Sequence, residues 1–258
     1  MTSGASELFD TTFTALHAQG PLKTWSLIVT IFGDIAPAKE DHLDSQLLAA
    51  LTAPFGVKPE ALRVALHRLR KDGWLEAVKR GRRSAYHLSA TGEALTHAAY
   101  AQIYRTAPSG QGADWQIELL EDAAIAKRAG SAVVGPNMLV SPAKGGAGGL
   151  NIPASEVPAW MRASLTSAEA TAEFALYTKA LAGLVPQLAT AKLDPPQKLA
   201  LRLLVLHHWR RIVLRQPEVH EALLGEGWAG HTARQLTLEV FETLGRPALS
   251  ELANLQNA

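Results

Sequence analysis

The chain has 258 residues, of which 47% are hydrophobic and 19% charged, and its formal net charge at pH 7 is +1. This composition is typical of an ordered globular protein and excludes an intrinsically disordered one. The absence of cysteine excludes disulfides, thiolate catalysis and cysteine-ligated zinc. The N-terminus lacks the basic and apolar regions of a signal peptide, and the best apolar runs, 25–32 and 199–206, are too short to span a membrane. We therefore expect a cytoplasmic protein.

Breaks in the sequence pattern divide the chain. Residues 106–113 and 141–158 are rich in Gly, Pro and Ser, and Asp194-Pro195-Pro196 ends one helix and begins another. We expect three domains, at residues 1–106, 107–165 and 166–258.

Hydrophobic periodicity predicts an α+β fold that is mostly α. The N-terminal part is expected to contain helices at 21–33, 43–53, 58–72 and 91–105, with strands at 74–80 and 83–88. The middle part is expected to contain strands at 115–120 and 132–140 around a helix at 121–129. The C-terminal part is expected to be helical at 166–188, 195–216, 219–224 and from 231 to near the end.

The most informative segment runs from residue 58 to residue 88. It contains nine Lys or Arg and three Asp or Glu, a net charge of +6, so the rest of the chain is net acidic. Such a concentration of positive charge is typical of a surface that binds nucleic acid. A helix that starts at Pro59 would gather the apolar residues Leu62, Ala65, Leu66 and Leu69 on one face.

The remaining residues of this segment complete the pattern of a winged helix-turn-helix. Arg63, His67 and Arg70 lie on another side of the helix, where we expect them to read base edges in the major groove. Arg68 falls on a flank, where it pairs internally or contacts the DNA backbone. Asp72-Gly73 ends the helix. In the strand at 83–88, Ser84, Tyr86 and Leu88 alternate with Arg83, Ala85 and His87 as a half-buried strand should. The residues expected to contact phosphates are Lys71, Lys79, Arg82 and Arg83.

The helix at 195–216 carries a second group of cations. Leu199, Leu203, Leu206 and Val213 form its apolar stripe, whereas His207, Arg211 and Arg215 are spaced at i, i+4 and i+8. One reading is a buried helix whose arginines pair with acids of neighbouring helices. The other is a site for the phosphates of an effector that resembles coenzyme A. For this reading the candidate effector-binding residues are His207, Arg210, Arg211 and Arg215.

Metal and enzyme chemistry find little support in the sequence. The nine histidines are scattered, and the adjacent His207 and His208 diverge on a helix. Neither a G-x-S-x-G nor an H-E-x-x-H motif is present. We expect no metal, no cofactor and no catalytic site.

The chain resembles the PaaX family of bacterial transcriptional repressors. The resemblance lies in the runs 23–34 and 63–69, in Asp72-Gly73-Trp74-Leu75, and in Gly81-Arg82-Arg83-Ser84 and Ile103-Tyr104. It continues in the C-terminal part at 207–210, 222–224 and 227–230. The chain has His207-His208-Trp209-Arg210 where the family usually has His-Asp-Tyr-Arg, and Gln216-Pro217 where Asp-Pro is common.

This resemblance implies a winged-helix domain, a small central α+β domain of ferredoxin-like type, here short and glycine-rich, and a helical C-terminal domain for effector binding and dimerisation. It implies a homodimeric repressor of phenylacetate or related aromatic-acid catabolism. Such a repressor binds palindromic operators in double-stranded DNA and leaves them when phenylacetyl-CoA or another acyl-CoA binds. Two alternatives stay open: a winged-helix module that binds proteins, and an enzyme that processes CoA esters.

Overall fold

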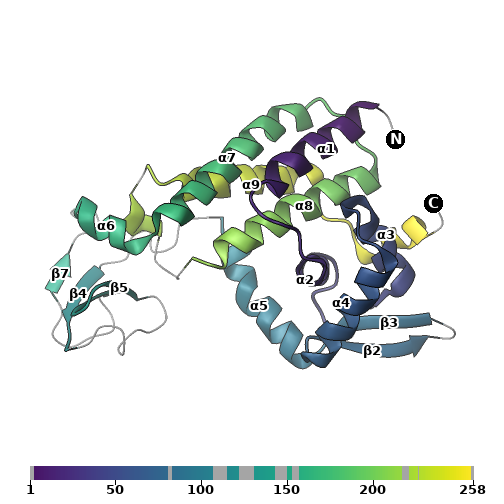
Figure 1. Ribbon diagram of the computed structural model, residues 1–258, viewed down its shortest axis with the longest axis horizontal. Helices are drawn as coiled ribbons and strands as arrows, with labels where there is room; N and C mark the ends of the chain where they lie inside the picture. The colour runs from purple at the N-terminus through teal and green to yellow at the C-terminus, as the bar shows by residue number, and fades with distance from the viewer. Residues whose placement is uncertain are drawn as a thin grey trace.

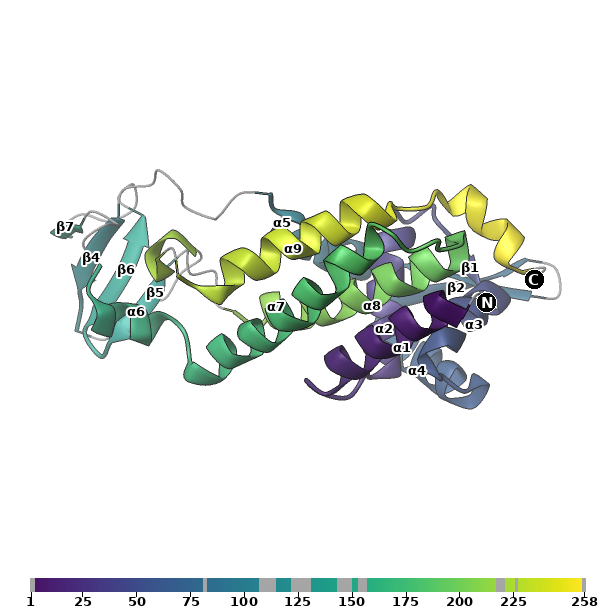
Figure 2. The ribbon, with the colours of Figure 1, turned by 90° about the horizontal axis from the view of Figure 1, so that it is seen from above.

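The computed structural model describes residues 3–80, 83–106, 115–121, 131–142, 150–152, 157–216, 221–225 and 227–256. Long C-terminal helices occupy the middle of the molecule (Figures 1 and 2). The β2–β3 hairpin lies at one end of them, and a small sheet formed by β4, β5, β6 and β7 lies at the other. The fold is α+β and mostly α, as predicted.

The N-terminal part contains the predicted helices and strands within a few residues of their expected bounds. Its elements are α2 (Thr24–Ile35), β1 (Leu43–Asp44), α3 (Ser45–Thr52), the 3-10 turn η1 (Ala53–Phe55), α4 (Pro59–Lys71), β2 (Leu75–Arg80), β3 (Arg83–Leu88) and α5 (Ala90–Tyr104). The three strands form an antiparallel sheet of order β1-β3-β2.

Local sequence chemistry sets these bounds. The Asp44 carboxylate accepts from the Leu47 amide at the start of α3, and the Ser89 hydroxyl accepts from the Gly92 amide at the start of α5. Gly73, with a φ of 73°, ends α4 in a conformation that favours glycine. A Cβ on Gly92 would lie 2.2 Å from the Trp74 carbonyl oxygen, so glycine lets α5 approach the end of α4 closely.

Helix α1 (Ser3–His17) was not among the predicted elements. It packs against α7 (Ala168–Leu188) and α8 (Pro195–Val213). Its buried residues are Leu8, Thr12 and Leu16, and the partly buried Phe9 and Phe13 pack against the same core. Thr12 is accommodated since its hydroxyl donates to the Leu8 carbonyl, 2.8 Å away.

The middle part of the chain forms a second antiparallel sheet, of order β5-β6-β4-β7. Its strands are β4 (Trp115–Leu119), β5 (Ala132–Gly135), β6 (Met138–Pro142) and β7 (Leu150–Ile152). The prediction of one strand at 132–140 was wrong, because Pro136-Asn137 forms a turn that divides this segment into a hairpin. The helix expected at 121–129 lies almost entirely outside the described residues, so the ferredoxin-like assignment stays a prediction.

Helix α6 (Ala159–Leu165) and the 3-10 helix η3 (Glu221–Leu224) pack together beside this sheet. Met161, Leu165 and Leu223 form a small core with Trp115 and Val140 of the sheet. This second core is separate from the main one.

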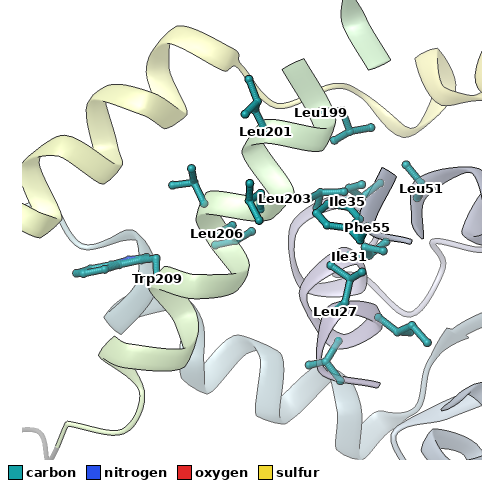
Figure 3. Close-up of a cluster of buried hydrophobic side chains, with 14 of the residues drawn as sticks. Leu27, Ile31, Ile35, Leu51, Phe55, Leu199, Leu201, Leu203, Leu206 and Trp209 are labelled. Atoms are coloured by element: carbon teal, nitrogen blue, oxygen red, sulfur yellow. The ribbon is translucent and has the colours of Figure 1, made fainter. Parts of the chain in front are cut away.

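The C-terminal part completes the fold with α7, α8, α9 (Ala229–Leu244) and the 3-10 helix η4 (Leu249–Gln256). Helix α8 lies at the centre, and all four residues of its predicted apolar stripe are buried. Figure 3 shows Leu199, Leu203 and Leu206 of α8 close to Ile31 and Ile35 of α2. The main core therefore contains residues from nearly the whole length of the chain, from Leu8 of α1 to Leu252 of η4. The proposed domain boundaries stay predictions, and the packing shows that residues from both ends of the chain share one core.

A buried ion pair fixes α2 on α8. Both carboxylate oxygens of Asp34 accept from the guanidinium of Arg202, at 2.7 and 2.8 Å. The hydroxyl of Tyr104 donates to the same carboxylate at 2.8 Å. Asp34 and Tyr104 belong to the motifs that carry the family resemblance, and this contact gives them a structural role.

Candidate nucleic-acid interface

Helix α4 separates an apolar face from a basic one, as predicted. Leu62, Ala65, Leu66 and Leu69 are all buried, and the helix packs on α2. The cationic residues of α4 are exposed; they are Arg63, His67, Arg68, Arg70 and Lys71. The hydrophobic face thus attaches α4 to the protein and leaves its charged face to solvent.

Two of these cations have acidic neighbours on the helix surface. Arg63 donates to Glu60 at 2.9 Å and Arg68 to Asp72 at 3.4 Å. The Arg68 guanidinium also lies 5.5 Å from the ring centroid of Trp25. Exposed ion pairs of this kind contribute little to stability, about 0–1 kcal/mol. Arg63 and Arg68 can therefore exchange these partners for a stronger acceptor at low energetic cost.

The other cations of α4 have no such neighbour. Among the described residues, no carboxylate lies within ion-pair distance of His67, Arg70 or Lys71. These three side chains line a groove between the end of α4 and the start of β2, where Leu75, Glu76 and Ala77 form the opposite wall. A groove lined by the charges of Arg70 and Lys71, with Glu76 as its one acid, attracts an anionic polymer.

The β2–β3 hairpin extends the basic surface. Lys79 is exposed on β2. The backbone of Arg80, the last residue of β2, lies opposite the backbone of Arg83, the first residue of β3. The predicted phosphate contact Arg82 lies outside the described residues. The backbone of Arg83 belongs to β3, but its side chain is outside the description.

The expected alternation along β3 was wrong beyond Ser84. Ala85, His87 and Leu88 are all buried, and Tyr86 is partly buried. His87 is covered because its ring lies 4.7 Å from the ring of His42, and its Nδ1 lies 2.9 Å from the Leu88 carbonyl oxygen. The strand is therefore covered on both faces where it passes into the body of the protein.

Three of the four candidate effector residues lie together. His207, Arg211 and Arg215 line one pocket of the protein with Lys23 and Glu173. Arg210 lines a different cavity, because its guanidinium is directed to α2 and donates to Ser26 Oγ at 2.8 Å and Thr30 Oγ1 at 3.2 Å. Lys23, Gln19 and Glu173 were not predicted for this site. They lie about 40 to 190 residues away in sequence, and spacing carries no signal for such contacts.

Burial dominates the electrostatics of this pocket. Burial, with smaller effects from the charges of Arg210 and Arg211, lowers the pKa of His207 to about 3. The pKa of His208 is also lowered to about 3 by burial, with smaller effects from His207, Arg211 and His17. Both rings are therefore neutral at pH 7. The positive charge of the pocket comes from Lys23, Arg211 and Arg215.

Protein groups partly satisfy these cations. Arg215 forms an ion pair at 2.5 Å with Glu173 of the neighbouring helix α7, as one of the two interpretations of this helix expects, although the Arg215 side chain is 51% exposed and not buried. Arg211 donates through Nη2 to the Gln19 carbonyl, whereas its Nε is buried without a hydrogen-bond partner among the described residues. Within the same described part of the chain, both polar atoms of the Gln19 side-chain amide are also buried without partners. Such unsatisfied groups in a polar pocket are typical of a site that binds water or a ligand.

The described residues contain no group of three metal-ligating side chains that could hold a metal ion. No helix in the described part of the chain could cross a membrane.

Comparison with known proteins gives the same family at both ends of the chain. Residues 23–92 match the model of the PaaX-like protein family, and residues 166–253 match that of the PaaX-like protein C-terminal domain. The transcriptional repressor PaaX of Escherichia coli (strain K12) is 31% identical over 262 residues, which cover 89% of this chain and 83% of the repressor. This relative is a regulator and not an enzyme, so the alternative of a CoA-ester-processing enzyme is not supported. The chain belongs to the PaaX-like family of transcriptional regulators.

Proposed function

We propose that this protein is a ligand-responsive transcriptional repressor and that residues 24–88 form its winged helix-turn-helix. In this proposal α3 and α4 are the two helices of the motif and the β2–β3 hairpin is the wing. The observation that carries the proposal is the exposed basic face of α4 beside a hairpin that bears further cations. The repressor relative supports a role in DNA binding.

The side chains of α4 suit different parts of a DNA duplex. Arg63 and Arg70 are exposed and able to donate two parallel hydrogen bonds to guanine in the major groove, and His67 lies one turn from Arg63 and Arg70. Lys71 and Lys79 carry compact charges that suit phosphates. Arg82 and Arg83 would extend these phosphate contacts. A homodimer would place two copies of α4 on the half-sites of a palindromic operator.

A mobility-shift experiment with the DNA upstream of the protein's own gene tests this proposal. We expect a retarded complex whose affinity falls steeply with salt, because phosphate contacts release counterions. Lys71→Ala should weaken binding to specific and unrelated DNA alike, and exposed Lys198→Ala on α8 serves as the control. Failure to retard any DNA fragment would favour the alternative of a protein-interaction module.

We further propose that the pocket of His207, Arg211 and Arg215 binds the anionic part of an effector, as the family resemblance implies for an acyl-CoA. Lys23, Arg211 and Arg215 supply its positive charge, and the unpaired amide of Gln19 supplies further hydrogen bonds. The pocket lies between α2 and the C-terminal helices, so a ligand there would alter how the winged helix rests on α8. Such a shift would change the spacing of the two winged helices in a dimer and weaken operator binding.

Calorimetric titration tests the effector site. We expect phenylacetyl-CoA to bind the wild-type protein and Arg211→Ala to bind it at least tenfold more weakly, since charge-assisted hydrogen bonds to phosphate are lost. Coenzyme A alone should retain much of the affinity if its phosphates provide the binding energy. Unchanged affinity in Arg211→Ala would refute the site.

A further inference from the structure

A cavity of about 210 Å³ lies between α2, α5 and α8, on the other side of Arg210 from the pocket discussed above. Its walls are mostly apolar and include Val29 and Gly33 of α2, Ala99 of α5, Leu206 of α8 and the ring of Trp74. For comparison, an apolar cavity of ~150 Å³ in another protein accommodates benzene. This cavity therefore has room for one aromatic ring or a short alkyl chain.

Arg210 lies at the polar end of this cavity. Its Nε donates to Thr30 Oγ1 at 3.2 Å, and its Nη2 donates to Ser26 Oγ at 2.8 Å and to the Ser26 carbonyl at 3.1 Å. These acceptors are neutral. Among the described residues, neither a carboxylate within ion-pair distance nor an acceptor for Nη1 accompanies this guanidinium.

Two fully buried arginines near α8 differ from the partly exposed Arg210 in this respect. Arg202 is 4% exposed and pairs with Asp34 at 2.7 Å, and Arg234 is 3% exposed and pairs with Glu221. Burial of a charge is costly unless an opposite charge compensates it. Burial lowers the pKa of Arg210 to about 10, which still leaves it charged at pH 7. Arg210 is partly exposed, and its positive charge has no carboxylate partner among the described residues beside this mostly apolar cavity.

We propose that this cavity binds a small organic monocarboxylate, with its apolar body between α2, α5 and α8 and its carboxylate on Arg210. Nη1 of Arg210 would donate to the ligand, and the ligand's charge would replace the missing carboxylate partner. The body would displace water from apolar walls, which contributes roughly 25 cal/mol for each Å² of apolar surface buried. Leu95 and Tyr100 are 46% and 45% exposed beside the cavity, so the ligand would enter between them.

The proposal is tested by calorimetric titration of the full-length protein with benzoate and hexanoate and with their neutral amides, benzamide and hexanamide. We expect at least one carboxylate to bind at least tenfold more tightly than its amide. Arg210→Gln should remove this preference for charge. Ala99→Leu should place extra carbon atoms in the cavity and weaken binding at least tenfold, whereas Ala101→Leu, at an exposed position of the same helix, should leave it unchanged.

The outcomes separate this proposal from the proposed repressor function, because no DNA is present. Absence of binding by both carboxylates, equal binding of acid and amide, or unchanged binding in Ala99→Leu would overturn the proposal. Thermal unfolding of each variant checks that it is folded. If Arg210→Gln does not fold, the comparison of acid with amide in wild type and in Ala99→Leu decides the question alone.

Discussion

Replacing Asp34 by Asn should destabilise the protein far more than its small change in shape suggests. The Asp34 side chain is fully buried and holds the Arg202 guanidinium by two hydrogen bonds, at 2.7 and 2.8 Å, while the Arg202 side chain is 5% exposed. Asn retains one acceptor and loses the charge, so Arg202 would remain buried without compensation. Breaking one partner of a buried ion pair costs about 3–5 kcal/mol.

Urea denaturation followed by circular dichroism measures this cost as a change in the free energy of unfolding. Asp72→Asn is the matched control, because it removes the same charge from the exposed pair with Arg68, whose side chains are 50% and 62% exposed. The control should lose less than about 1 kcal/mol. Asp34→Asn combined with Arg202→Met should recover much of the lost stability, since no buried charge is then left unpaired; Arg246, the more distant partner of Asp34 at 3.9 Å, is 37% exposed. Equal losses in Asp34→Asn and Asp72→Asn would refute the reasoning.

Three further predictions concern pH, packing and salt. Since His207 and His208 have lowered pKa values of about 3 in the folded protein, the unfolded chain takes up their protons first as pH falls. The contribution of these two rings to the free energy of unfolding should therefore be constant above about pH 6.5. It should decrease from there towards pH 3, by roughly 1.4 kcal/mol per pH unit for each ring. Urea denaturation at pH 7, 6 and 5 measures this slope; it should be shallower in His207→Gln, and a flat profile in wild type would contradict the assignment. Leu66→Ala should cost about 2–5 kcal/mol in the same assay, because Leu66 is 3% exposed, whereas Val64→Ala at 70% exposure should be nearly neutral; similar losses would contradict the orientation of α4. In Lys71→Ala the dependence of log affinity for DNA on log salt concentration should be less steep by about one, and an unchanged slope would show that Lys71 contacts no phosphate.

The sequence predicted the local features of the N-terminal part well, because they depend on short-range chemistry. Pro59 begins α4, Gly73 ends it, and the spacing of Leu62 and Leu66 determines which face is buried. The hairpin at 132–142 was missed because apolar residues continue on both sides of Pro136-Asn137. Helix α1 was missed although its apolar residues Leu8, Phe9, Phe13 and Leu16 recur at helical spacing.

The sequence could not show which charges meet in space. Asp34 and Arg202 are 168 residues apart in the sequence. They form an ion pair because α2 packs against α8, and the sequence pattern does not show this packing. For the same reason the stripe of His207, Arg211 and Arg215 could be recognised on one helix, but its partners Gln19, Lys23 and Glu173 could not. Arg210 was grouped with this stripe because it is adjacent in sequence to Arg211. On the helix the two side chains point about 100° apart, so Arg210 faces another cavity.

The most direct test of the central claim measures how Arg70→Ala changes the preference for operator DNA over unrelated DNA at one salt concentration. The operator is first located by footprinting on the upstream region of the gene. If Arg70 of α4 reads a base edge, the variant should lose about 1–3 kcal/mol of this preference, roughly 5- to 150-fold, while its affinity for unrelated DNA changes much less. An unchanged preference, with α4 still folded, would contradict the placement of α4 in the major groove.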